Sequence, residues 1–172
     1  MNPMYHLTRF VFMLLIVLLG CSSSADIASP EGIGEKERIR VVDGNQAARI
    51  INRMHNQSVA ADANVIAEYG KEKEDLLYIS YYADQKQAKK AFDLMIEKMA
   101  AAKKGPVFHL MPLNTYIKPV YFTLGMGASH YIFISGKFLL WLQTHQSFGG
   151  ELPPRLLNLY PLTSEPAGGR SV

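Results

Sequence analysis

The chain has 172 residues, of which 48% are hydrophobic, 19% charged and 10% aromatic, and its formal net charge is +3. This length allows one globular domain with short extensions, and the composition is too apolar and too weakly charged for a disordered chain. No block of lysine or arginine alternates with aromatic residues, so we expect no nucleic-acid binding. A single cysteine excludes a disulfide within the chain and a zinc site built of cysteines.

The first twenty residues are a predicted signal peptide. Arg9 gives a basic start, an apolar run follows over 10–19, and small residues come after it. Residues 10–21 would form only about 18 Å of helix, whereas the hydrocarbon core of a bilayer is roughly 30 Å thick. We therefore expect a segment that directs export and is removed, rather than a retained membrane span.

The end of this segment, Leu18-Leu19-Gly20-Cys21, resembles the lipobox of bacterial lipoproteins. The resemblance implies cleavage between Gly20 and Cys21, with a diacylglycerol on the Cys21 sulfur and an acyl chain such as palmitate on its new amino terminus. Two or three acyl chains hold a protein firmly at a bilayer, whereas one holds it only marginally. In such lipoproteins an aspartate after the cysteine favours the inner membrane. Ser22 at this position therefore implies the outer membrane, if the cell envelope has two.

The boundaries of the folded part follow from composition. Residues 21–37 contain the predicted lipidated cysteine and then serine, glycine, proline and charge without periodicity, so we expect a flexible tether. Such a tether would keep the domain close to the membrane surface. Residues 38–162 are predicted to form a single domain, and residues 163–172 a disordered tail.

Hydrophobic periodicity predicts both strands and helices in this domain. Strands are predicted at 38–42, 64–70, 75–83, 117–125, 130–136 and 137–144. Apolar residues at helical spacing predict two main helices, one with Ala47, Ile50, Ile51 and Met54 and one with Ala88, Ala91, Phe92, Met95 and Met99. Pro153 and Pro154 open a predicted last short helix. This order predicts an α+β two-layer sandwich, ferredoxin-like or related, whose mostly antiparallel sheet carries the two main helices on one face.

Residues with the spacing of a catalytic site are not evident. Ser129 stands in a Gly-x-Ser sequence, but a nucleophile elbow requires a second glycine where Tyr131 stands, and a strand-to-helix turn. After Glu97 the acidic residues are Glu151 and Glu165, so paired carboxylates for acid–base catalysis are scarce. We expect a protein that is not an enzyme, and a hydrolase is the weakest alternative.

The sequence also gives little support for a metal or cofactor. The histidines after the signal peptide are far apart and lack metal-site spacing: His55, His109, His130 and His145. His109 and Met111 form an H-x-M pair that could bind Cu(I) if Met95 or Met99 lay near, but methionines on a helical stripe more often fill a core. We therefore expect no metal and no cofactor apart from the lipid on Cys21.

Aromatic residues concentrate on the predicted strands. If helices cover one face of the sheet, an open face could bind a partner sheet or an apolar ligand, although core packing explains the same pattern. The predicted interaction face consists of Tyr78, Tyr82, Tyr131 and Trp141. We expect a non-catalytic interaction or assembly module that binds a partner protein or its own copy. The alternative is a carrier of a small apolar ligand or lipid, in a cavity lined by Phe92, Tyr131 and Trp141.

Charge is distributed unevenly along the chain. Residues 21–97 hold 10 basic and 13 acidic side chains, whereas residues 98–172 hold 7 and 2. The basic half could contact anionic headgroups or another anionic envelope polymer. Its lysines are spread through several predicted elements, so solvation of scattered charges is the alternative.

Overall fold

The computed structural model describes residues 27–55, 61–102, 107–116, 118–146, 148 and 151–162. The predicted signal peptide, Cys21 and the predicted tail lie outside these residues. The elements are β1 (Gly32–Ile33), β2 (Lys36–Asp43), α1 (Gly44–His55), β3 (Ala63–Tyr69), β4 (Asp75–Tyr81), α2 (Gln85–Ala101), β5 (Val107–Leu113), β6 (Val120–Gly125), β7 (Ala128–Ser135), β8 (Phe138–Thr144) and α3 (Pro154–Leu159). None of the helices in the described ranges is both long enough and apolar enough to cross a membrane.

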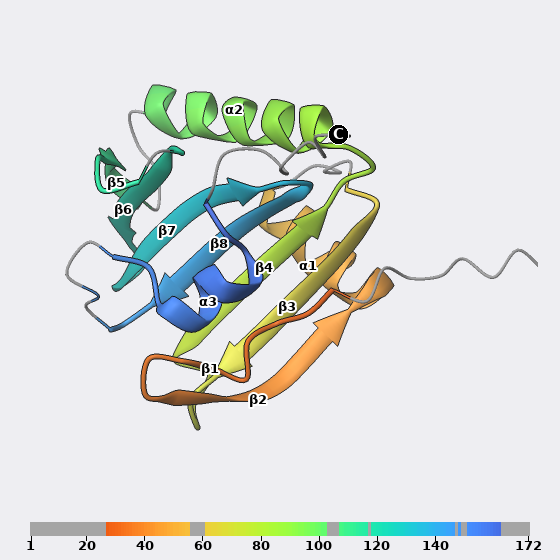
Figure 1. The fold of residues 1–172 in the computed structure, drawn as a ribbon, viewed down its shortest axis with the longest axis vertical. Coiled ribbons are helices and arrows are strands. Elements are labelled where there is room, and N and C mark those ends of the chain that lie inside the picture. Colours follow the sequence, from red (N-terminus) through yellow and green to blue (C-terminus); the bar gives the residue numbers. More distant parts are fainter. Residues whose placement is uncertain are drawn as a thin grey trace, which may run out of the picture.

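All the strands belong to one antiparallel sheet in the order β1-β2-β3-β4-β8-β7-β6-β5. The sheet curls into a half-barrel, and the helices beside it are few and short (Figure 1). The predicted two-layer α+β sandwich, ferredoxin-like or related, is therefore wrong. The physical reason is that β1 and β5 enlarge the sheet to eight strands, and segments near both ends of the domain cover the face that the sandwich would leave open.

The main core lies on the face of the sheet that carries α3. Val65, Ile79, Leu140 and Phe133 are consecutive partners across β3, β4, β8 and β7, and each is at most 5% exposed. They are covered by residues from both ends of the domain: Ile27, Ile33, Leu152, Leu156 and Tyr160. Burial of each such aliphatic side chain stabilises the fold by about 1.5–3 kcal/mol before conformational entropy is subtracted.

Part of the predicted tether belongs to the fold, because residues 27–37 are packed or paired in the described structure. Ile27 is 8% exposed and Ile33 is fully buried. The Tyr69 hydroxyl donates to the Pro30 carbonyl at 3.0 Å, and β1 pairs with the start of β2. Two isoleucines thus anchor a segment whose serine, glycine and proline content is typical of a linker. Residues 22–26 separate Cys21 from the first described residue.

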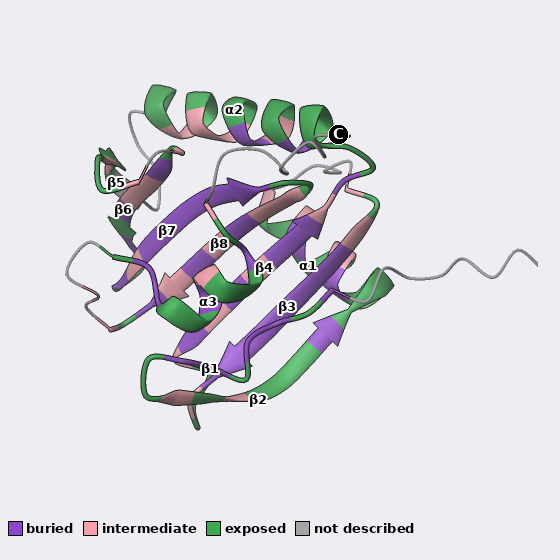
Figure 2. Ribbon diagram, viewed as in Figure 1, coloured by how far each residue is buried: buried purple, intermediate pink, exposed green. Residues whose placement is uncertain are grey.

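The opposite face of the sheet carries α1 and α2. Ala47 and Ile51 of α1 pack on β2 and β3, and Phe92 of α2 packs on β7. The side chain of Asp84 accepts from the Gln87 backbone N–H at 2.8 Å and so caps the start of α2. Figure 2 shows that the strands in the middle of the sheet are mostly buried, whereas β2 is exposed over much of its length.

Candidate functional site

The aromatic residues predicted to form an interaction face do not share one open surface. Tyr131 is 2% exposed in the core beneath α3, and Tyr82 is 4% exposed. Tyr78 and Trp141 are direct partners across β4 and β8 on the other face, half-buried against α1 and α2 respectively. Phe92 and Trp141 belong to one cluster and Tyr131 to another, so these three residues do not line a common cavity.

Exposed apolar side chains gather instead around the turn between β6 and β7. Met126 at the turn is 60% exposed, Leu124 at the end of β6 is 44% exposed, and Met111 on the neighbouring β5 is 46% exposed. We call Met111, Leu124 and Met126 the turn patch. A shallow depression of about 380 Å³ opens beside it and is lined by Leu124, Gly125, Met126, Gly127, Ala128, Ser129, Thr144 and His145.

The backbone of this turn is unusual for its sequence. Met126 has φ 49° and Gly127 has φ 76°, so both residues of the two-residue turn are left-handed. Such turns favour Asn-Gly or Asp-Gly, because the left-handed region costs most other residues roughly 1–2 kcal/mol. Met126 is unusual here for two reasons: its backbone is left-handed, and its apolar side chain is exposed to water. Residues of this kind cluster at functional sites.

Two hydrogen bonds fix the base of the turn. The ring of His130 is fully buried, its Nε2–H donates to the Gly125 carbonyl at 3.0 Å, and the Trp141 Nε1–H donates to its Nδ1 at 2.9 Å. Because the indole can only donate and the carbonyl can only accept, the imidazole is neutral with its proton on Nε2. Burial lowers the pKa of His130 and outweighs the Gly125 bond that raises it, and nearby His145 lowers it further. Both ring nitrogens are therefore occupied within the protein.

The polar residues next to the depression hold three segments together. The buried carboxylate of Asp75 accepts from the His145 backbone N–H at 3.0 Å, from Lys36 Nζ at 3.1 Å and from the side chain of Gln146. Burial acts to raise the pKa of Asp75, but these hydrogen bonds together lower it. The His145 ring lies with Nδ1 2.6 Å from the Glu74 carbonyl oxygen. This network ties the start of β2 and the start of β4 to the segment after β8.

The residues considered for catalysis or metal binding are not brought together. Ser129 lines the depression, but within the described ranges no hydrogen bond joins its side chain to a histidine. His109 and Met111 lie on β5, where Met111 pairs with Phe122 of the α3-face core. Met95 and Met99 belong to α2 and pack with Phe92 and Ile132 on the other face. The part of the chain that is described contains no group of three His, Cys, Asp or Glu side chains that could hold a metal ion.

Sequence reasoning did not identify the turn patch, although one signal for it is present. Met126 stands between Gly125 and Gly127, in the short connection between the predicted strands 117–125 and 130–136, where polar residues are usual. An apolar residue at that position is the feature that could have marked the site.

No family model matches the chain, and comparisons with curated proteins and with solved structures find no significant match.

Proposed function

We propose that this protein is a membrane-anchored lipoprotein of the bacterial cell envelope whose folded part is a non-catalytic module that binds a partner protein through the turn patch. The anchor is supported by the lipobox resemblance of Leu18-Leu19-Gly20-Cys21. Under this proposal residues 1–20 are removed, Cys21 carries the lipid, and Ser22 directs the protein to the outer membrane where two membranes are present.

The observation that carries the interaction role is the exposure of Met126 in a left-handed turn. Asparagine or glycine at this position would suit both the backbone and the contact with water, so neither folding nor solubility explains the methionine. Methionine is flexible and polarizable, and it adapts to the shape of a partner. Leu124 on β6 and Met111 on the adjoining β5 extend the apolar contact.

The edge of the sheet next to the patch is poorly suited to pairing with another strand. Pro112 lacks a backbone N–H, and the register of β5 shifts between Phe108 and Met111. The partner is therefore expected to bind by side-chain packing against Met126 and Leu124. The side chains of Ser129 and His145 beside them supply a polar rim.

Site-specific photo-crosslinking tests the turn patch. We replace Met126 by a photoreactive phenylalanine analogue in the cells that make the protein, and expect one discrete adduct after irradiation. Adding Leu124→Asp should abolish it, because the charge would have to be desolvated at the contact. The same analogue at Leu159, which is 43% exposed on α3, is the control. The proposed site would be overturned if position 126 gave no adduct, or if both positions gave equal adducts. The mass of the adduct shows whether the partner is a second copy of this chain or another protein.

The anchor has a separate test. Cys21→Ala should abolish both acylation and cleavage, since the sulfur is the attachment atom. A Cys21→Ala chain that is cleaved normally and stays bound to the membrane would contradict the lipid anchor while leaving the turn patch untouched.

A further inference from the structure

A second surface, at the other end of the sheet order, combines exposed apolar and basic side chains. On β2, Ile39 is 48% and Val41 is 44% exposed; on α1, Ile50 is 38% and Met54 is 49% exposed. Three exposed arginines accompany them. The β2–α1 surface consists of Ile39, Val41, Ile50, Met54, Arg40, Arg49 and Arg53.

The described fold makes no use of this apolar surface. Helical spacing predicts Ala47, Ile50, Ile51 and Met54 as one buried stripe, but the structure buries Ala47 and Ile51 and leaves the other two exposed. On the outer side of β2, β1 pairs with Lys36 and Glu37, and no described strand pairs beyond them. Val41 pairs with Ala67 on the face that carries α3, whereas Ile50 and Met54 lie on α1 at the opposite face. The exposed apolar side chains therefore border the β2 edge of the sheet on both of its sides, without a partner in the described chain.

The charge of the surface is positive. Residues 39–55, which span it, contain three arginines and one aspartate, a net charge of +2. Arg40 lies 3.7 Å from a carboxylate oxygen of Glu68, and neither Arg49 nor Arg53 forms an ion pair with a described acidic residue. The structure therefore concentrates basic charge here, whereas the lysines of residues 98–172 are scattered.

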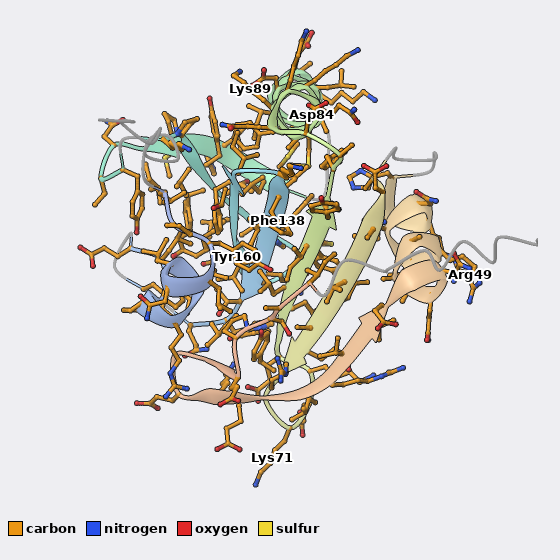
Figure 3. The ribbon with its side chains drawn as sticks, turned by 45° about the vertical axis from the view of Figure 1, so that its right-hand side comes forward. Arg49, Lys71, Asp84, Lys89, Phe138 and Tyr160 are labelled. Atoms are coloured by element: carbon orange, nitrogen blue, oxygen red, sulfur yellow. The ribbon has the colours of Figure 1, made fainter. Side chains whose placement is uncertain are left out.

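The proposed lipid anchor lies close to this surface. Five residues separate Cys21 from Ile27, and an extended chain spans at most about 3.5 Å per residue, so Ile27 lies within about 21 Å of Cys21. The first described residues, at the red end of the ribbon, pack on the face of the sheet that carries α3, near the end of β2 (Figure 1). Arg49 points away from the sheet on this side of the molecule (Figure 3). A short connection therefore keeps the β2 edge of this surface close to the bilayer that holds the anchor.

We propose that the β2–α1 surface rests on the bilayer that holds the anchor, with its arginines at anionic lipid headgroups and its apolar side chains at the boundary of the acyl chains. This inference depends on the proposed lipid anchor. Arginine suits such a position, because its aliphatic stem packs on apolar groups while the guanidinium stays among the headgroups. A mixture of exposed apolar residues and basic charge is typical of interfacial membrane contacts. The surface then orients the domain, which the lipid alone would leave free to rotate.

The orientation keeps the proposed partner site accessible. Five strand-to-strand steps separate β2 from β6 in the sheet, and at about 4.8 Å per step the path along the sheet is roughly 24 Å. The turn patch is therefore displayed away from the membrane contact.

A fluorescent label on the mature lipoprotein tests the membrane contact. Cys21 is the single cysteine, and lipid would block it, so Met54→Cys introduces one reactive thiol for an environment-sensitive dye. We reconstitute the labelled protein into vesicles of phosphatidylcholine alone or mixed with phosphatidylglycerol. The emission from position 54 should shift to the blue on the anionic vesicles. Leu159→Cys, which replaces a residue of similar exposure on α3, should show no shift.

Charge reversal supplies a matched pair of variants. Arg49→Glu with Arg53→Glu should abolish the shift, whereas Lys86→Glu with Lys90→Glu, an exposed pair at the same spacing on α2, should leave it intact. Equal shifts from positions 54 and 159 would overturn the inference. The inference would also be overturned if the label at position 54 remained exposed to water on lipid vesicles but became buried in native envelope membranes. That result would show that the surface binds a protein and not the lipid.

The same experiment separates failure of the inference from failure of the anchor. If the protein floats with the vesicles but position 54 remains in water, the anchor is retained and the membrane contact is refuted. If the protein does not float and both cysteines react with the dye, the lipid anchor itself is refuted, and the membrane contact with it.

Discussion

At the scale of single residues, His130 couples the stability of the fold to pH. Its Nδ1 accepts from Trp141 and its Nε2–H donates to Gly125, so a second proton would break the bond from the indole. Burial lowers its pKa from 6.5 in the folded state. The unfolded chain therefore binds a proton near pH 6.5 that the folded chain does not. The contribution of His130 to the free energy of unfolding is therefore fully present above this pH. Below it the contribution is lost, by at most about 1.4 kcal/mol per pH unit.

Trp141 is the single tryptophan and reports this change directly. Urea unfolding followed by its fluorescence should give a lower free energy of unfolding at about pH 5.5 than at about pH 7.5. His130→Gln should reduce this difference. Part of it should remain, because burial and Lys98 also lower the pKa of His55. A pH dependence identical in both proteins would contradict the assigned role of His130.

The carboxylate of Asp75 is the other residue on which the fold depends. It is fully buried, and hydrogen bonds from β2 and from the segment after β8 hold its pKa below the ordinary value of 3.8. Its contribution to stability is therefore present above pH 3.8 and is lost as the pH falls through the lowered pKa. We expect Asp75→Asn to reduce the free energy of unfolding by about 2–4 kcal/mol. The amide NH2 introduced there is a donor and would face groups that now donate to the carboxylate.

Asp93→Asn is the matched control. Asp93 also accepts from a lysine, Lys89 at 2.6 Å, but the pair is exposed on α2. Its loss should change the free energy of unfolding by less than about 0.5 kcal/mol. Equal effects of the two substitutions in chemical denaturation would show that the buried network does not stabilise the fold.

At the scale of elements, the turn between β6 and β7 should show opposite effects on stability and on binding. Met126→Asn suits the left-handed backbone and should raise the free energy of unfolding by about 0.5–1 kcal/mol. The same change should reduce binding of the partner, because it removes the most exposed part of the turn patch. Denaturation and competition with the crosslinked protein measure the two effects. A destabilised Met126→Asn protein would contradict the strained-turn interpretation.

Most elements could be predicted from local sequence signals. The predicted strands at 64–70 and 75–83 correspond to β3 and β4, and apolar residues at helical spacing located α1 and α2. Two strands were missed for physical reasons. β1 has two residues, too few for any periodicity, and β5 contains Pro112, which is typical of a loop or an edge.

The arrangement of the elements could not be predicted in the same way. Tyr78 and Trp141 pair across β4 and β8 although they are far apart in sequence, and no local pattern encodes such a partner. Tyr131 was expected on an open face, but residues near both ends of the domain cover it. Ile27 and Tyr160 lie in that cover, and their flanking sequences resemble linkers. The error in fold class and the error about the aromatic face therefore have the same cause: the terminal segments that cover this face resemble linkers in sequence.

At the scale of the whole molecule, the segment before β2 is an integral part of the fold. Ile33 is fully buried, so Ile33→Ala should reduce the free energy of unfolding by about 2–4 kcal/mol. Ile39→Ala on the exposed side of β2 should change it by less than about 0.5 kcal/mol. Urea denaturation of both variants checks this difference. If residues 27–37 were a flexible tether, Ile33→Ala would be as harmless as Ile39→Ala.

The two proposed contacts divide the molecule between a membrane and a partner. The β2–α1 surface lies near the proposed anchor, and the turn patch lies five strands away in the sheet. A curled sheet covered on both faces is a rigid spacer between them, because its core residues are closely packed. The fold then sets the distance and the orientation at which the partner site is presented.

The lipid anchor is the claim on which this arrangement depends, and intact-mass analysis of the protein gently extracted from its own envelope tests it most directly. We predict a chain that begins at Cys21 and carries the added mass of a diacylglycerol and an acyl group. A chain that retains residues 1–20, or one that is cleaved elsewhere and has a free thiol at Cys21, would contradict the anchor and the membrane orientation that follows from it.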